Sequence, residues 1–149
     1  MPSAKTSCFV DTNIILYLRD PQDPHKQGTA RRWLEALAAR DALVVSPQVL
    51  NEYAANTLKK FRHVPFDALL ADLTAMQAWC RAPLGPTIAI EAAILHRRWG
   101  FAFYDSALLA AASASGCDLF LSENLHHGQQ VDGITIVNPF LAAPDQFEI

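Results

Sequence analysis

The amino-acid sequence predicts an α/β fold, in which one central parallel sheet is sandwiched between helices. Short apolar runs typical of buried strands alternate with longer segments of helical periodicity. Strands that are separated by helices require crossover connections, which make neighbouring strands parallel and put helices on both faces of the sheet. The chain has 149 residues, of which 51% are hydrophobic, so it is long enough to form one domain with a sizeable core.

The N-terminal part of the chain contains two predicted strands. Residues 7–10 read as a short strand and residues 14–18 as the start of a helix. The segment "DPQDPHKQG" is rich in Pro and Asp and is expected to form a loop before a helix at about residues 29–40. "ALVVS", residues 42–46, then reads as a second, buried strand.

Helices dominate the middle of the chain. Ser46 and Pro47 form a strong helix start, with the serine at the N-cap and the proline at the first helical position, so "QVLNEYAANTLKKF" should be helical. Further helices are predicted from residue 65 to about 79, over residues 87–98, and within "FAFYDSALLAAASASG". A glycine follows each of the last two helices and is expected to end it.

Two more strands are expected near the C-terminus. "DLFLS", residues 118–122, reads as the third strand, "ENLHHGQQVDG" as a loop, and "ITIV", residues 134–137, as the fourth strand. Residues 141–149 lack periodicity and are expected to form a tail. No repeat or low-complexity segment suggests a second domain, so residues 1–149 should form one domain with a core at about residues 7–140.

The net charge of −3 is unlike that of a generally basic nucleic-acid-binding protein. Positive side chains nevertheless gather at residues 31–32, 59–63 and 96–98. Such groups are usually solvated helix faces, and they are also compatible with contacts to phosphate.

The other bulk features exclude several classes of protein. Cys8, Cys80 and Cys117 are odd in number and widely spaced, so they are expected to be small core residues rather than a disulfide framework or a zinc site. No apolar run approaches the roughly 18 residues of a membrane span, and the N-terminus is a poor signal peptide. We therefore expect a soluble, cytoplasmic protein.

Acidic side chains stand where packing alone would not require them. Asp11 follows the first strand, at the edge where open α/β sheets bind ligands, although aspartate is also a favoured N-cap residue. Glu52 lies in the second turn of its helix, where an exposed glutamate would be unremarkable. Asp105 shares a helix face with Leu108 and Leu109, so its carboxylate should face inward. A buried carboxylate needs a cation, a metal or a water-filled cleft.

A fourth polar group, Ser122-Glu123-Asn124, directly follows the third strand, where it would be ordinary loop chemistry if it stood alone. Two of the four places follow strands and two lie on helices, so a parallel sheet could bring them to one edge. Hard oxygen ligands without well-spaced His or Cys favour Mg²⁺ or Mn²⁺, which commonly bridge to phosphate oxygens. The pattern therefore indicates metal-assisted phosphodiester hydrolysis.

Four segments together resemble the PIN domain and, within it, the VapC-type toxins of bacterial type II toxin–antitoxin systems: "FVDTNIILYL", "SPQVLNEY", "FYDSALLAAASASGCDLFLSENLHHGQ" and "ITIVNPF". The resemblance covers roughly residues 7–140. It implies an α/β/α sandwich and a Mg²⁺-dependent endoribonuclease in which Mn²⁺ can substitute. It also implies a homodimer that is held inactive by a small cognate antitoxin, with DNA contacted only through that antitoxin.

The resemblance assigns roles to individual residues. Asp11, Glu52 and Asp105 match the family's metal-binding and catalytic acids. Thr12 and Asn13 match the polar pair that supports the first acid, and Ser122 matches the hydroxyl residue after the last strand of the site. These supporting residues are Thr12, Asn13 and Ser122.

The chain departs from the family pattern at the fourth acid. The aspartate expected two residues after Ser122 is Asn124, with Glu123 beside it. Asparagine offers only a neutral carbonyl oxygen, so one negative charge is missing unless Glu123 turns inward. Because Mg²⁺ often uses only one or two carboxylates, we expect activity with weaker metal binding.

Four basic side chains are candidates for contact with RNA or with the antitoxin. His126 and His127 lie in the loop after Asn124, where a surface position is the simpler interpretation. Arg97 and Arg98 close a helix, a position that also complements the helix dipole.

Other functions remain open from the residues. A catalytically weakened PIN domain could act as an RNA- or antitoxin-binding module, since Asn124 replaces an acid. A phosphatase of the haloacid dehalogenase type also begins with an aspartate after a strand, but it requires a second acid where this chain has Asn13. A receiver-type phosphoacceptor would need an acidic pair before the first helix, which the sequence lacks.

Overall fold

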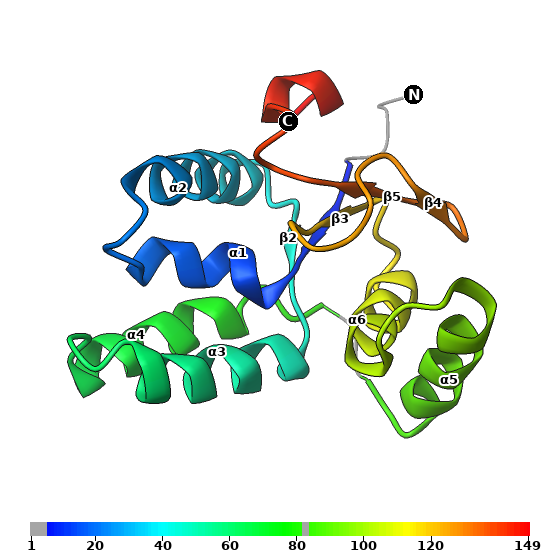
Figure 1. The fold of residues 1–149 in the computed structure, drawn as a ribbon, viewed down its shortest axis with the longest axis horizontal. Helices are drawn as coiled ribbons and strands as arrows, with labels where there is room; N and C mark the ends of the chain where they lie inside the picture. The colour runs from blue at the N-terminus through cyan, green and yellow to red at the C-terminus, as the bar shows by residue number, and fades with distance from the viewer. Residues whose placement is uncertain (1–5, 82–83) are drawn as a thin grey trace.

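The computed structural model describes residues 6–81 and 84–149 and contains a five-stranded sheet flanked by helices, an α/β/α arrangement (Figure 1). The strand order is β2-β1-β3-β5-β4. The strands are β1 (Cys8–Val10), β2 (Leu43–Val44), β3 (Leu119–Leu121), β4 (Gln130–Val131) and β5 (Ile134–Val137).

Six α-helices and two 3-10 turns accompany the sheet in the described residues. They are α1 (Thr12–Leu16), η1 (Tyr17–Arg19), α2 (Pro24–Ala39), α3 (Pro47–Lys60), α4 (Phe66–Gln77), α5 (Thr87–Trp99), α6 (Phe103–Ala114) and η2 (Pro144–Phe147). Helices α3 and α4 lie side by side, as do α5 and α6 (Figure 1). No helix in the part of the chain that the structure describes is long and apolar enough to span a membrane.

The register of the sheet places the ends of its central strands side by side. β1 pairs in parallel with β2 and β3, and β3 pairs in parallel with β5, as the sequence predicts. Val10 at the end of β1 lies opposite Leu121 at the end of β3. The residues that follow, Asp11 and Ser122, therefore leave the same edge of the sheet next to each other.

Two internal segments differ from their predictions. α2 begins at Pro24 rather than near residue 29, because the Asp23 carboxylate accepts a hydrogen bond from the Lys26 amide at 3.0 Å and caps the helix. Part of the predicted loop after β3 forms β4, which pairs antiparallel with β5 across a turn at Asp132 and Gly133. Both turn residues have positive φ angles, the conformation that an Asp-Gly hairpin turn requires.

The predicted C-terminal tail is anchored to α2. It contains η2, and the rings of Trp33 and Phe147 pack with their centroids 6.0 Å apart. The Trp33 indole nitrogen also donates to the carbonyl oxygens of Pro139 and Ala142, at 3.2 and 3.1 Å. Because a buried indole N–H needs an acceptor, Trp33 holds this segment against the domain.

The core is centred on β1 and β3, whose residues are all buried. The rings of Phe9 and Phe120 stack across these strands with their centroids 5.5 Å apart. Cys8 and Cys117 are buried, free core residues, as predicted, whereas Cys80 is free and half-buried. The central strands are thus held by apolar packing on both faces, which fixes the position of their carboxyl ends.

A polar cluster joins η1, α3 and α4. The Arg19 guanidinium donates two hydrogen bonds to the Asp72 carboxylate, at 2.9 and 2.8 Å, and the Tyr53 hydroxyl donates a third at 2.5 Å. Tyr53 is 1% exposed, so its hydroxyl depends on Asp72 for a partner. This cluster supports the helix that carries Glu52.

We expect Arg19→Met to lower the free energy of unfolding by about 2 kcal/mol, because it leaves the partly buried Asp72 without its cation. Arg98→Met is the matched control, since Arg98 forms an exposed pair with Asp132 at 3.4 Å. Exposed pairs contribute less than about 1 kcal/mol. Urea denaturation measures both values, and equal losses would contradict the interpretation.

Candidate active site

Three acidic side chains from separate elements meet at the carboxyl edge of the sheet. Asp11 follows β1 and is only 6% exposed, Glu52 lies in α3, and Asp105 lies half-buried in the first turn of α6. The backbone ladder continues into this edge, because the Asp11 amide donates to the Leu121 carbonyl at 3.0 Å. The fold thus brings together the acids on which the sequence prediction rests.

Hydroxyl groups hold the first two acids. Ser122 Oγ donates to Asp11 Oδ2 at 3.0 Å. Thr12 Oγ1 donates to Glu52 Oε2 at 2.7 Å, so its hydroxyl orients the helical glutamate, while its backbone amide acts on the Asp11 carboxylate. The Asp11 side chain makes no N-cap hydrogen bond to α1.

Gln48 is a supporting residue that the sequence prediction missed. Its amide nitrogen donates to Glu52 Oε1 at 2.7 Å and also to the Tyr104 carbonyl at 3.3 Å, which ties α3 to the start of α6. The spacing of four residues between Gln48 and Glu52 is the signal that could have identified it. With Thr12 on the other oxygen, both Glu52 oxygens are oriented by neutral donors.

The electrostatics of the site favour an incoming cation. The pKa of Asp11 is raised to about 6, chiefly by burial and also by the nearby charges of Asp105 and Glu52, although the hydrogen bond from the Ser122 hydroxyl acts in the opposite direction. Burial also raises the pKa of Asp105, with Glu52 adding to the effect. Like charges and desolvation thus disfavour the ionised cluster, and a cation would relieve both.

The donor set suits a hard divalent cation. Within residues 6–81 and 84–149, no three His, Cys, Asp or Glu side chains are already arranged to hold a metal ion. Mg²⁺ does not require such a cage, because it keeps several waters and commonly uses one or two carboxylates. The carboxylates of Asp11 and Asp105, with Glu52 nearby, fit that mode of binding.

Glu123 is directed away from the acids and toward α2. Its carboxylate accepts hydrogen bonds from the Tyr17 hydroxyl at 2.5 Å and from the Lys26 ammonium group. Although partial burial raises the pKa of Glu123, these two donors bring it below its ordinary value. Lys26 also lies over the Phe140 ring, 5.0 Å from its centroid. The Glu123 charge is therefore compensated by Lys26.

Asn124 is exposed and lines a pocket beside the acids. The other candidate contact residues have different surroundings: His127 Nδ1 accepts from the Asn138 amide at 2.9 Å, and His126 is exposed. Arg98 pairs with Asp132, while Arg97 lines a shallow apolar pocket on α5. The structure joins none of these four basic residues to the acids through a hydrogen bond or an ion pair within the described ranges.

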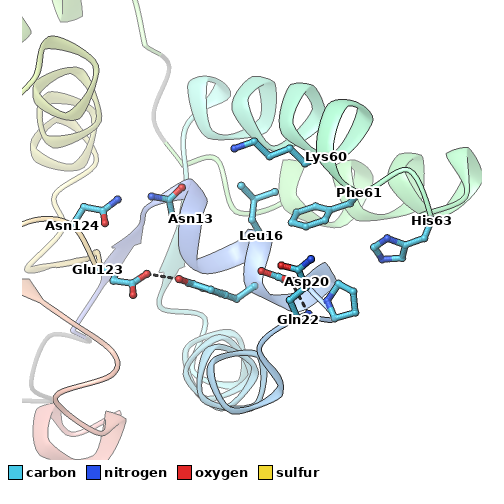
Figure 2. A pocket seen from close by; sticks show the side chains of 11 residues that line it. Asn13, Leu16, Asp20, Gln22, Lys60, Phe61, His63, Glu123 and Asn124 are labelled. Carbon is cyan, nitrogen blue, oxygen red and sulfur yellow. Dashed lines mark hydrogen bonds between the residues drawn. The ribbon is translucent and has the colours of Figure 1, made fainter.

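The pocket beside the acids has a volume of about 570 Å³ and lies between α1 and the end of α3 (Figure 2). We call it the Lys60 pocket. Its lining includes Asn13, Tyr17, Lys60, Phe61, His63 and Asn124. The sequence prediction noted the basic group at residues 59–63 but not that Lys60 and His63 line a pocket together with Asn13 and Asn124.

Comparison with known proteins supports a common fold. The family model described as PIN domain matches residues 8–129. A toxin–antitoxin complex from Klebsiella pneumoniae is 19% identical, with a TM-score of 0.64 and coverage of 89% of this chain and 98% of that chain. No curated protein sequence gives a significant match.

Two further structures have the same fold. Mycobacterium tuberculosis VapC20, a toxin that cleaves the sarcin–ricin loop, is 22% identical, with a TM-score of 0.57 and coverage of 76% of this chain and 87% of that chain. Rickettsia felis VapBC2, bound to a DNA fragment from its promoter, is 14% identical, with a TM-score of 0.60 and coverage of 88% and 97%. At sequence identities of 14–22%, the similarity to these structures shows a shared fold alone.

The raised pKa of Asp11 predicts a pH dependence of stability. The folded state holds the Asp11 proton up to about pH 6, whereas the unfolded state releases it near pH 3.8, so stability falls as the pH rises between these values. The loss amounts to about 3 kcal/mol. We expect Asp11→Asn to lack this loss, so that it becomes more stable than the wild type above pH 6.

The measurement is urea denaturation of both proteins from pH 4 to pH 8. Asp72→Asn is the control of opposite sign. Although burial raises the pKa of Asp72, its bonds to Arg19 and Tyr53 lower it below the ordinary value of 3.8, so the stability that this group contributes is present above that value and is lost only as the pH falls below it. Asp72→Asn should therefore be less stable than the wild type by a nearly constant amount from pH 4 to pH 8. Parallel pH profiles for the wild type and Asp11→Asn would contradict the assignment of a buried, uncompensated Asp11.

Proposed function

The chain belongs to the PIN domain family, and we propose that it is an endoribonuclease that hydrolyses RNA phosphodiester bonds with Mg²⁺, or with Mn²⁺ in its place. The observation that carries the proposal is the meeting of Asp11, Glu52 and Asp105 at one edge of the sheet, with Asp11 buried and lacking a cationic partner among the described residues. Such a carboxylate cluster is typical of sites that bind hard cations together with phosphate.

The residues of the chain have distinct roles in this proposal. Asp11 and Asp105, with Glu52, would hold the divalent ion, which supplies Lewis-acid stabilisation of the charge that develops on the phosphate. Ser122 and Thr12 orient the Asp11 and Glu52 carboxylates through their hydroxyl groups. These outer contacts keep the donor oxygens in place before the substrate arrives.

A second candidate function is favoured by the fourth acid position. Asn124 carries no charge, and Glu123 is engaged by Lys26 and Tyr17. A PIN domain with such a weakened site would act as an RNA- or antitoxin-binding module. It would bind its partner equally well in EDTA and would show no turnover with Mn²⁺.

We propose that the physiological role is that of a toxin in a toxin–antitoxin pair in the cytoplasm. Two of the similar structures are a toxin–antitoxin complex and a VapBC2 complex bound to promoter DNA, which supports an antitoxin as the partner. Ile90 and Ile94 of α5 are 64% and 52% exposed, and they offer an apolar surface for a second copy in a homodimer.

We expect Asp11→Asn and Asp105→Asn each to reduce Mn²⁺-dependent RNA cleavage by more than about a hundredfold, because each removes a charged ligand of the ion. Cleavage of a labelled RNA is measured by gel electrophoresis, and circular dichroism verifies the fold. Asp67→Asn, a change at an exposed acid in the first turn of α4, is the matched control. Full cleavage by either site variant would overturn the nuclease proposal.

The missing charge at Asn124 can be restored. Asn124→Asp should tighten Mn²⁺ binding by about fivefold or more, since a carboxylate replaces a neutral amide beside the acids. Isothermal titration calorimetry measures the affinity without reference to turnover. Asn51→Asp adds the same charge at an exposed position of α3 and should leave the affinity within about twofold. Equal effects of the two variants would show that Asn124 does not face the ion.

A further inference from the structure

We infer that the Lys60 pocket holds one nucleotide of single-stranded RNA beside the phosphate that is cut. The inference rests on the proposed nuclease function and adds to it a binding subsite with named residues. The pocket volume of about 570 Å³ lies within the roughly 300–1,000 Å³ that is typical of small-molecule sites.

The pocket begins where the acid cluster ends. Asn13 directly follows Thr12, whose hydroxyl holds Glu52, and Asn124 lies two residues after Ser122, whose hydroxyl holds Asp11. Figure 2 shows Asn13 and Asn124 on the same side of the pocket, with Lys60 extending toward them from α3. A nucleotide in the pocket would therefore have its neighbouring phosphate at the acids.

The wall formed by the end of α3 has the groups that recognise a nucleotide. Lys60 supplies a cation for a phosphate, and Phe61 supplies an aromatic surface for a base. The Phe61 ring meets the His63 ring edge to face, with centroids 6.0 Å apart, and His63 Nε2 lies 3.1 Å from the Arg19 carbonyl oxygen. The aromatic pair is thereby fixed to η1 before any ligand enters.

The opposite wall offers polar groups that suit a base or a sugar. The side-chain amides of Asn13 and Asn124 are exposed and form no hydrogen bond within residues 6–81 and 84–149. Amide groups can both donate to and accept from the edges of an unpaired base. These two residues are consequently available for recognition of an extruded or single-stranded base.

Two acidic residues, Glu123 and Asp20, also line the pocket. The Glu123 carboxylate is compensated by its ion pair with Lys26. Asp20 accepts a hydrogen bond from the Gln22 amide at 2.9 Å. The mixture of one cation, an aromatic ring and free amides fits a nucleotide better than it fits an apolar protein segment.

The experiment measures binding without turnover. All variants are made in the Asp105→Asn background and titrated in EDTA into a short fluorescein-labelled single-stranded RNA of mixed sequence, with fluorescence anisotropy as the readout. Lys60→Met should weaken binding by about three- to tenfold and reduce its salt dependence, because one phosphate contact is lost. Phe61→Leu retains apolar volume but removes the ring, and it should weaken binding by about fivefold.

Two neighbours provide matched controls. Lys59 is exposed next to Lys60 but does not line the pocket, and Phe66 is 63% exposed at the start of α4, also outside the pocket. Lys59→Met and Phe66→Leu should change the affinity by less than about twofold. If Lys59→Met weakens binding as much as Lys60→Met, the attraction is a general charge effect and the subsite is wrong.

The remaining outcomes separate the subsite from the nuclease activity. If Lys60→Met and Phe61→Leu weaken RNA binding as expected but the wild type shows no metal-dependent cleavage, the subsite is upheld and the nuclease proposal is overturned. If the wild type cleaves RNA but both pocket variants bind it as tightly as the background protein does, the nuclease proposal is upheld and the subsite is overturned. The subsite would be overturned if the background protein bound no RNA. It would also be overturned if the pocket variants lost binding to a protein partner but kept their binding to RNA.

Discussion

The site depends on one unfavourable placement, the burial of the Asp11 carboxylate at the end of β1. The carboxylate is 6% exposed, receives one hydrogen bond from Ser122, and lies near two further acids. A side chain in this state would normally move toward water or toward a cation. It is prevented from doing so because the apolar strands β1 and β3 are locked in register beneath it. The stability of the core thus maintains a local site that favours cation binding.

Much of this arrangement could be predicted from the sequence because it follows from local patterns. Apolar runs separated by helices predict the parallel sheet, and polar residues directly after two strands identify its functional edge. Asp105 could be recognised because its neighbours on the helix face are leucines. The hairpin of β4 and β5 also has a local signal, the Asp132-Gly133 turn, which was missed because the surrounding segment is polar and short.

The contacts that orient the acids could not be predicted in the same way, since they join segments far apart in the chain. Thr12 bonds to Glu52, and Lys26 bonds to Glu123, across 40 and 97 residues. Whether Glu123 faces the acids or α2 depends on how closely α2 approaches the loop after β3, which no periodicity specifies. Lys26 could be seen only as one charge in a predicted loop, because the Asp23 cap that makes this segment helical was not recognised.

The pairing of Glu123 with Lys26 gives the two halves of the site different electrostatic characters. On one side, Asp11 and Asp105 have raised pKa values because burial and like charges disfavour their ionised forms. On the other side, Lys26 cancels the Glu123 charge and Lys60 adds a positive charge at the pocket. A fourth uncompensated carboxylate between them would repel any phosphate that spans both halves. A chain with a net charge of −3 can therefore present a locally permissive path for an anionic ligand next to a cluster of acids.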